Sequence, residues 1–276
     1  MSERLKITTR GQGPELVLLH GWAMHSGIWG GVVDLLTSEY RVNLVDLPGH
    51  GVNRHMPLSR DLNEVADMIL SELPPAVWIG WSLGGLVTLA AALQQPYKVH
   101  KTILVAATPC FSKQTDWDLG VSAEARQAFA DGLETDFEET LKQFYLQCFG
   151  AAWVDESLHR LGRSTVPDNV SDNIPDNIPE RHDNLPSNLP DRHVMHTGLH
   201  LLYSNNLLAG LQTCKVPMLF LGGTRDRTIR AESYEQAAAM LPSASSRLIR
   251  GAGHVPFISH QDRFVDIIRG FLREDQ

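Results

Sequence analysis

Gly80-Trp81-Ser82-Leu83-Gly84-Gly85 lies between an apolar run, residues 76–79, and a segment rich in Ala and Leu, residues 86–93. The first composition favours a strand and the second a helix, so a strand, a tight turn and a helix are predicted to meet at one serine. In this setting G-x-S-x-G is the pattern of a nucleophile elbow, which holds the serine hydroxyl clear of the sheet edge. The alternative is a glycine-rich turn with an incidental serine, because short patterns recur by chance.

The composition is that of a globular protein, with 276 residues, 43% of them hydrophobic and 20% charged. This length suits one large α/β domain or a domain with an insertion. The N-terminus has no apolar core of signal-peptide length and no later run reaches the length of a membrane span, so we expect a cytoplasmic protein that does not enter membranes. Cys110, Cys148 and Cys214 are odd in number and widely spaced, which fits reduced thiols better than disulfides or a zinc site.

The net charge of −8 argues against a nucleic-acid partner, because such proteins present a basic face. Residues 112–210 hold 16 acidic and 7 basic side chains, so the rest of the chain is nearly neutral. The negative charge therefore lies in the middle of the chain.

Strand and helix patterns alternate on both sides of this middle segment, which indicates parallel βαβ units. We therefore predict an α/β fold, with a mostly parallel central sheet, helices on both faces and an inserted helical cap. The boundaries are residues 1–111 and 211–276 for the core and 112–210 for the cap. Strands are expected at residues 5–9, 15–19, 41–45, 76–79, 102–107, 216–221 and 247–249, and helices at 28–36, 61–73, 83–93, 231–240 and 263–272.

Within the cap, Thr135 and Glu138 form a capping-box pattern that predicts a helix to about Cys148, and residues 198–211 suggest a last cap helix. Between them, at about residues 166–192, a unit close to Asp-Asn-Ile-Pro recurs. Proline every fourth residue excludes helix and sheet, so an extended surface loop is expected. It is either a docking arm or a tolerated expansion.

A serine nucleophile requires a base and a group that orients the base. His254 follows the last predicted strand in a loop of small residues, and Asp226 follows the preceding strand. Both are expected at the carboxyl edge of the sheet, beside Ser82. The chain order Ser82, Asp226, His254 is the order in which α/β-hydrolases supply a catalytic triad.

The tetrahedral intermediate requires two hydrogen-bond donors aimed at its oxyanion. The backbone N–H of Leu83, directly after the nucleophile, is one candidate, and that of Trp22 in the His20-Gly21-Trp22 loop is the other. His20 itself is expected to be a buried loop histidine that bonds to the backbone.

Other candidate sites are less favoured. His193, His196 and His200 stand at near-helical spacing, but no acidic ligand accompanies them, so no metal is expected. Asp46 lies too early in the sheet to orient His254 and is expected to stabilise the turn that follows it. The first strand carries no dinucleotide-binding glycine pattern, so no cofactor is expected.

Five segments resemble the pimeloyl-[acyl-carrier protein] methyl ester carboxylesterases of biotin synthesis, within the α/β-hydrolases. They are LLHGW (18–22), LVDLPG (44–49), GWSLGGLV (80–87), PCFS (109–112) and HVPFISH (254–260). The first and third are common among hydrolases, whereas the last two are more particular. The resemblance covers most of the core and thins out in the cap.

The resemblance implies hydrolysis of a methyl ester at the far end of a pimeloyl chain on acyl-carrier protein, by Ser82, His254 and Asp226. It also implies that Trp22 and Leu83 line the acyl pocket, and it adds two residues of the first cap helix, Phe144 and Gln147. A general short-chain carboxylesterase or lactonase is the alternative within enzymes. A hydrolase-fold receptor without turnover is the alternative from another class.

The implied partner is the acidic carrier protein, which a monomer would meet transiently. Members of the family carry basic residues on the cap for this contact. Here Lys142, Arg160 and Arg163 could form a local basic patch, although Glu138 and Glu139 lie on the same predicted helix as Lys142. At physiological salt, charges are screened over about 8 Å, so a local patch can outweigh the cap's overall sign.

Overall fold

The computed structural model describes residues 4–150 and 189–274. Its centre is a seven-stranded sheet in the order β1-β3-β2-β4-β5-β6-β7. β1 pairs antiparallel with β3, and every other pairing is parallel, so the predicted α/β fold with a mostly parallel sheet is confirmed. The strands are β1 (Ile7–Arg10), β2 (Glu15–Leu19), β3 (Arg41–Val45), β4 (Ala76–Trp81), β5 (Val99–Val105), β6 (Met218–Gly223) and β7 (Ala244–Ile249).

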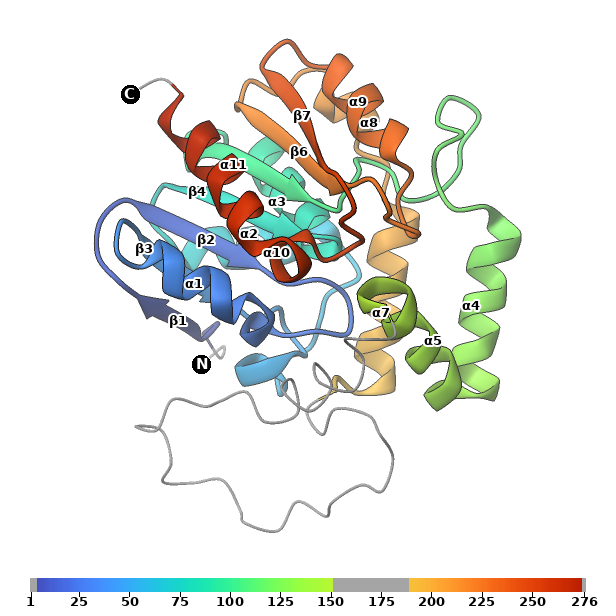
Figure 1. Ribbon diagram of the computed structural model, residues 1–276. Coiled ribbons are helices and arrows are strands. Elements are labelled where there is room, and N and C mark those ends of the chain that lie inside the picture. Colours follow the sequence, from blue (N-terminus) through green and yellow to red (C-terminus); the bar gives the residue numbers. More distant parts are fainter. Residues whose placement is uncertain (1–3, 151–188, 275–276) are drawn as a thin grey trace.

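Helices cover both faces of this sheet. α1 and α11 lie on the near face in Figure 1, and α2 and α3 lie on the far face. The helices of the core are α1 (Gly30–Leu36), α2 (Leu62–Glu72), α3 (Leu83–Gln94), α9 (Ala231–Ala239), α10 (Pro256–Ser259) and α11 (Gln261–Arg273), with short 3-10 turns η1 (Ser26–Trp29) and η2 (Gly51–Asn53).

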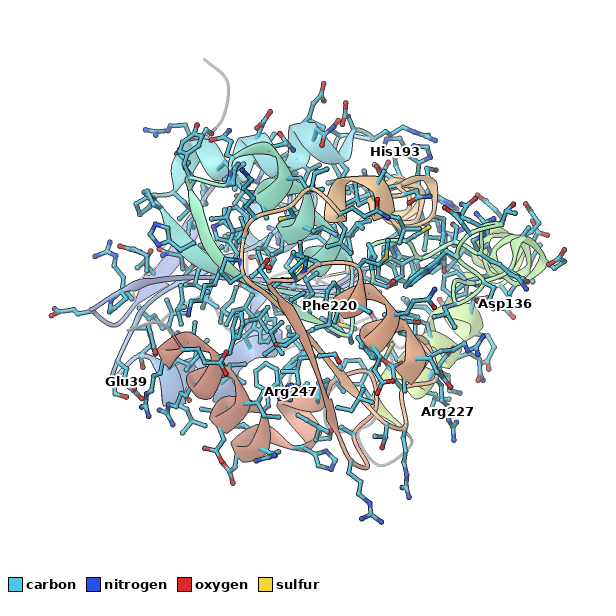
Figure 2. The ribbon with its side chains drawn as sticks, turned by 90° about the horizontal axis from the view of Figure 1, so that it is seen from above. Glu39, Asp136, His193, Phe220, Arg227 and Arg247 are labelled. Atoms are coloured by element: carbon cyan, nitrogen blue, oxygen red, sulfur yellow. The ribbon has the colours of Figure 1, made fainter. Side chains whose placement is uncertain are left out.

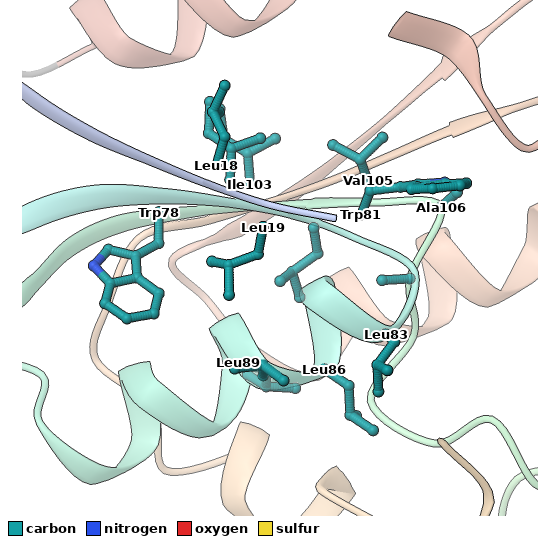
Figure 3. Close-up of a cluster of buried hydrophobic side chains, with 14 of the residues drawn as sticks. Leu18, Leu19, Trp78, Trp81, Leu83, Leu86, Leu89, Ile103, Val105 and Ala106 are labelled. Carbon is teal, nitrogen blue, oxygen red and sulfur yellow. The ribbon is translucent and has the colours of Figure 1, made fainter. Parts of the chain in front are cut away.

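The hydrophobic core follows from the near-continuous apolar runs of the central strands, which are buried on both faces. In Figure 3, Leu18, Ile103 and Val105 point to one face of the sheet, and Leu19 and Trp78 point to the other, toward α3. Leu83, Leu86 and Leu89 of α3 meet the second group. All eight side chains are at most 1% exposed, so α3 and the turn before it are held firmly.

Three longer helices from the middle of the chain, α4 (Ala123–Thr135), α5 (Phe137–Phe149) and α7 (Arg192–Ser204), lie together off one end of the sheet (Figure 1). We call them the cap helices. Two hydrogen bonds join them to the loop after β2, from Tyr145 Oη to Ala23 O (3.2 Å) and from Trp22 Nε1 to Met195 O (2.8 Å). The cap therefore rests on the edge where the parallel strands end.

The capping box predicted for the first cap helix is wrong. Asp136, not Thr135, caps α5, because its side chain accepts the N–H of Glu139. The hydroxyl of Thr135 instead donates to Asp131 O (2.8 Å) at the end of α4, a helix that we did not predict. Two helices thus meet where one was expected to begin.

The last cap helix begins earlier than predicted and is broken. Asp191 caps α7 by accepting the N–H of Val194, so the helix starts directly after the proline-rich segment. It ends at Ser204, since the following residues turn to the segment after β5, where Leu207 N–H donates to Pro109 O (2.9 Å). A separate short helix, α8 (Leu208–Leu211), follows.

Of the loop predicted at about residues 166–192, residues up to 188 lie outside the described residues, as do Arg160 and Arg163. The three cysteines are free and buried, which confirms that they form no disulfide. Within the described ranges, every helix is too short or too polar for a bilayer crossing.

Candidate active site

Ser82 occupies the turn between β4 and α3 with a strained backbone. Its φ of 54° and ψ of −116° are values that residues with a side chain rarely adopt and that cost about 1–3 kcal/mol. A Cβ on Gly80 would lie 2.2 Å from Gly84 O, and one on Gly84 would lie 2.5 Å from His20 O. The two glycines of the motif therefore allow strand, turn and helix to close up, as expected for a nucleophile elbow.

Asp226 and His254 lie on neighbouring loops, after β6 and β7, and are joined by a hydrogen bond. The donor is His254 Nδ1, 2.9 Å from Asp226 Oδ2, and both side chains are almost fully buried. A carboxylate accepts only, so Nδ1 carries the proton. The other ring nitrogen, Nε2, is then the basic atom of the neutral ring.

The carboxylate of Asp226 accepts three further hydrogen bonds. Thr228 N–H (2.8 Å) and Ile229 N–H (3.1 Å) donate to Oδ1, and Tyr234 Oη (3.2 Å) donates to Oδ2. Burial alone would raise the pKa of Asp226, but His254 and these backbone N–H groups lower it below its ordinary value. Asp226 is thus held as a carboxylate that orients the imidazole.

The position of His254 relative to Ser82 is set by Trp81. Its indole Nε1 donates to His254 O (2.8 Å), and its ring lies 5.6 Å from the His254 ring, between centroids. Because Trp81 directly precedes Ser82, the two loops are fixed beside one another. Within the described residues, His254 Nε2 is buried without a hydrogen-bond partner and makes no hydrogen bond to Ser82 Oγ. Such bonds often close fully only when substrate binds.

His20 shapes the loop that faces Ser82. Its Nδ1 donates to Gly21 O (2.8 Å), and its Nε2 accepts the N–H of Leu47 (3.0 Å), which confirms the predicted backbone-bonding histidine. Complete burial, with the nearby His50, lowers the pKa of His20 to about 3, so the ring stays neutral. A Cβ on Gly21 would lie 3.2 Å from Ser82 Cβ, so this loop approaches the serine closely.

The two backbone N–H groups predicted to bind the oxyanion, those of Trp22 and Leu83, have no acceptor within the described part of the chain. Leu83 is the first residue of α3, where an N–H has no partner in its own helix and the helix dipole favours negative charge. Free donors beside a strained serine are what an oxyanion site requires.

The side chain of Trp22 contacts all three cap helices. Its ring meets Phe144 of α5 (4.9 Å) and Phe129 of α4 (5.6 Å) edge-on, with distances between centroids. Its Nε1 donates to Met195 O of α7. A Cβ on Gly198 would lie 2.7 Å from Trp22 Cδ1, so a glycine in α7 allows the indole to pack there. An aromatic cluster thus lies between the cap and the serine.

The model of the family described as "Alpha/beta hydrolase family" matches residues 16–267. The chain belongs to this family. It is 36% identical over 269 residues to a pimeloyl-[acyl-carrier protein] methyl ester esterase of Xylella fastidiosa, covering 96% of this chain and 98% of the relative. A relative of the same name from Nitrosomonas europaea is 35% identical over 270 residues, covering 95% and 96%. The resemblance noted from the motifs is therefore confirmed over nearly the whole chain.

Solved structures support the fold. A hydrolase from Oleispira antarctica superposes with a TM-score of 0.83 at 16% identity, covering 99% of this chain and 96% of that one. An esterase from Exiguobacterium antarcticum gives 0.78 at 19% identity, covering 98% and 95%. At these identities the likeness concerns the hydrolase architecture alone.

Other predicted site residues of this hydrolase lie on α5 or beyond the described residues. Phe144 faces Trp22, as given above. Gln147 donates from Nε2 to Arg227 O (3.1 Å) and so joins α5 to the Asp226 loop. Lys142 is exposed and lies 3.8 Å from Glu139, which offsets part of its charge.

Of the three histidines named as possible metal ligands, His193 is exposed on α7 (Figure 2) and the other two make other contacts. His196 Nε2 lies 3.1 Å from Glu134 Oε1 of α4, and His200 Nδ1 lies 3.0 Å from an Arg60 nitrogen. In residues 4–150 and 189–274, no group of three or more His, Cys, Asp or Glu could hold a metal ion.

Sequence reasoning missed three side chains around the site. Trp81 was noted only as part of the motif, although it holds His254. Phe129 lies on the helix that we did not predict, where Ser122 caps the first turn and was the available signal. Tyr234 gave no signal, because a tyrosine in an amphipathic helix is ordinary.

Proposed function

We propose that this protein is a serine carboxylesterase that hydrolyses the methyl ester of pimeloyl-acyl-carrier protein, releasing methanol, in biotin biosynthesis. The relatives named for this reaction support the substrate, because they align over nearly the whole chain. The observation that carries the chemistry is the buried His254–Asp226 bond, with the free ring nitrogen on the loop that Trp81 fixes beside Ser82.

In the first half-reaction, Ser82 Oγ attacks the ester carbonyl and His254 Nε2 takes the hydroxyl proton. Asp226 stabilises the imidazolium that forms, and the N–H groups of Trp22 and Leu83 bind the oxyanion. When the intermediate collapses, His254 gives the proton to the methoxide oxygen. Methanol leaves and the acyl group stays on Ser82.

In the second half-reaction, water attacks the acyl-enzyme carbonyl while His254 Nε2 accepts one of its protons. The second tetrahedral intermediate is bound by the same two N–H groups. Its collapse returns the proton to Ser82 Oγ and releases the free carboxylate of the pimeloyl chain.

The acyl chain is proposed to lie against Trp22, Leu83, Phe144 and Gln147. The aromatic cluster around Trp22 supports this position, because a methylene chain gains free energy from leaving water for such a surface. Residues 112–210 are proposed as a helical cap inserted into the hydrolase core. This pocket would give longer apolar acyl groups an advantage over acetyl esters.

The carrier protein is proposed to dock on basic residues from the middle of the chain. Lys142, Arg160 and Arg163 are the proposed contacts, but Lys142 lies near Glu139 and the other two fall outside the described residues. We propose a cytoplasmic monomer that meets its carrier transiently.

The test is methanol release from the pimeloyl-acyl-carrier-protein methyl ester, with Ser82→Ala as the negative variant. The matched control is Ser112→Ala, which removes another buried hydroxyl, one that donates to a backbone carbonyl, Tyr203 O. We expect turnover by the parent and the control, and none by Ser82→Ala.

Two rival functions predict different results, which two additional measurements would distinguish. A general esterase would release methanol from free dimethyl pimelate as efficiently as from the carrier-bound ester, or would cleave the carrier thioester too. A receptor without turnover would not be labelled by a fluorophosphonate at Ser82. No methanol from the carrier-bound ester would refute the proposed substrate.

A further inference from the structure

One buried side chain near the site has no place in the mechanism above. Tyr234 lies on α9 and is fully buried, yet its phenol oxygen reaches Asp226 Oδ2 at 3.2 Å. This is the same carboxylate oxygen to which His254 Nδ1 donates at 2.9 Å. The phenol therefore donates to the carboxylate oxygen that also accepts the imidazole N–H, and it can influence both the position and the charge of that oxygen.

The absence of a side chain at Gly222 makes room for the Tyr234 ring. A Cβ on Gly222, in β6, would lie 2.2 Å from Tyr234 Cε2 and from Cζ, whereas carbon atoms in contact lie about 3.5–4.0 Å apart. Only a glycine leaves room for the ring at this point of the strand. Gly222 and Tyr234 therefore form a matched pair that brings the phenol to the carboxylate.

We propose that Tyr234 is a positioning residue, which rests on the catalytic roles proposed above for Ser82, His254 and Asp226. Its O–H holds Oδ2 of the carboxylate, while two backbone N–H groups of the loop hold Oδ1. With both oxygens fixed, the carboxylate cannot rotate, and the imidazole keeps one orientation toward the serine.

The phenol also weakens the electrostatic effect of Asp226 on His254. Its O–H donates to Oδ2 and takes up part of the negative charge there, so less negative charge remains to stabilise a protonated His254 ring. Tyr234 stays neutral, because burial and the nearby Asp226 raise its pKa well above the ordinary value. Cys148 of α5 also lies near Asp226, and burial, together with that carboxylate, raises the pKa of the thiol well above its ordinary value, so it is also neutral.

The test is Tyr234→Phe, which keeps the ring and removes only the hydroxyl. Without the phenol, the carboxylate binds the imidazolium more strongly, so the acid limb of kcat/KM should move to higher pH. We expect kcat to fall about tenfold, the effect of losing one hydrogen bond to a charged group. KM should stay unchanged, because Tyr234 does not touch substrate. The assay is hydrolysis of p-nitrophenyl acetate.

The matched control is Tyr145→Phe, which also loses a fully buried phenol, one that donates to a backbone carbonyl, Ala23 O. Both variants should lose some thermal stability, but only Tyr234→Phe should move the acid limb. Gly222→Ala, which pushes the ring away, should move it in the same direction.

A second measurement needs no turnover. In protein with labelled histidine, the His254 Nδ1–H resonance should shift in Tyr234→Phe relative to the parent, because its acceptor, Asp226 Oδ2, has lost a hydrogen bond. An unchanged resonance and an unchanged acid limb would overturn the positioning role. Failure of the parent on the carrier-bound ester would refute only the proposed substrate, because neither readout uses that ester. Full activity of Ser82→Ala would refute the triad and this role together.

Discussion

Replacing Gly21 by Ala should move the loop His20-Gly21-Trp22, which carries one proposed oxyanion donor, while leaving the side chains of the proposed triad in place. The added Cβ would lie 2.8 and 2.9 Å from two ring carbons of Trp81 and 3.2 Å from Ser82 Cβ. Carbon atoms need about 3.5 Å, so the loop and the ring must separate by about 0.7 Å. The Trp81 ring cannot retreat easily, because it bonds to His254 O and packs on Phe257 at 5.4 Å between centroids.

The loop must therefore move, and with it the N–H of Trp22. A displacement near 1 Å at a reacting centre can cost about 100-fold, and loss of one oxyanion donor costs about 100- to 1,000-fold. We expect kcat of Gly21→Ala to fall about 10- to 100-fold with KM nearly unchanged. Overpacking should lower the free energy of unfolding by about 1–3 kcal/mol.

The assay is steady-state hydrolysis of p-nitrophenyl acetate, with circular dichroism as the check of folding. Gly30→Ala is the control, because a Cβ at this first residue of α1 meets nothing within 4 Å. A folded Gly21→Ala protein with kcat within twofold of the parent, or an equal loss in Gly30→Ala, would refute the role given to this loop.

Three further outcomes follow from the same geometry. Asp226→Asn should lower kcat about 10,000-fold with the fold intact, since an amide favours the wrong imidazole tautomer; a loss below 100-fold in the ester assay would contradict this. Trp81→Phe keeps a ring but removes the hydrogen bond to His254 O, so kcat should fall several-fold while KM changes less, as initial rates would reveal. Because His20 stays neutral to about pH 3 when folded but binds a proton near pH 6.5 when unfolded, stability should fall progressively as pH drops from 6.5, by up to about 1.4 kcal/mol per unit; urea midpoints independent of pH would contradict this.

The central sheet was predictable because its strands are apolar on both faces and are separated by clear turn residues. Asp226 and His254 could be placed at one edge of the sheet, since each follows a strand and parallel strands end together. Their hydrogen bond needed only that the two strands be neighbours, which the pairing of β6 and β7 provides. Sequence could not supply the bond that Trp81 makes to the His254 loop, because it joins residues 173 positions apart.

The cap was less predictable than the sheet, and α4 was not predicted at all because it buries little of its surface. Of the residues in α4, only Leu133 is buried, so the helix lacks the apolar stripe that marks a core helix. The end of α7 at Ser204 depends on pairing with a distant segment near Pro109, which no local pattern encodes.

Tyr234 illustrates a third limit. The helix that carries it was predicted, and its burial follows from the apolar face of that helix. Its bond to Asp226 depends on how closely α9 approaches β6, which is set by the missing side chain of Gly222. A contact of this kind needs both partners in three dimensions.

The Trp22 indole donates a hydrogen bond to Met195 O and packs on Phe129 and Phe144. These contacts limit how freely the cap of one such enzyme can be exchanged for that of another. A chimaera that grafts another relative's cap onto this core would break contacts made by Trp22, the residue whose backbone N–H is proposed to bind the oxyanion. Exchanging the cap would therefore change the substrate range and the catalytic rate together. A successful exchange would also require a compatible loop after β2.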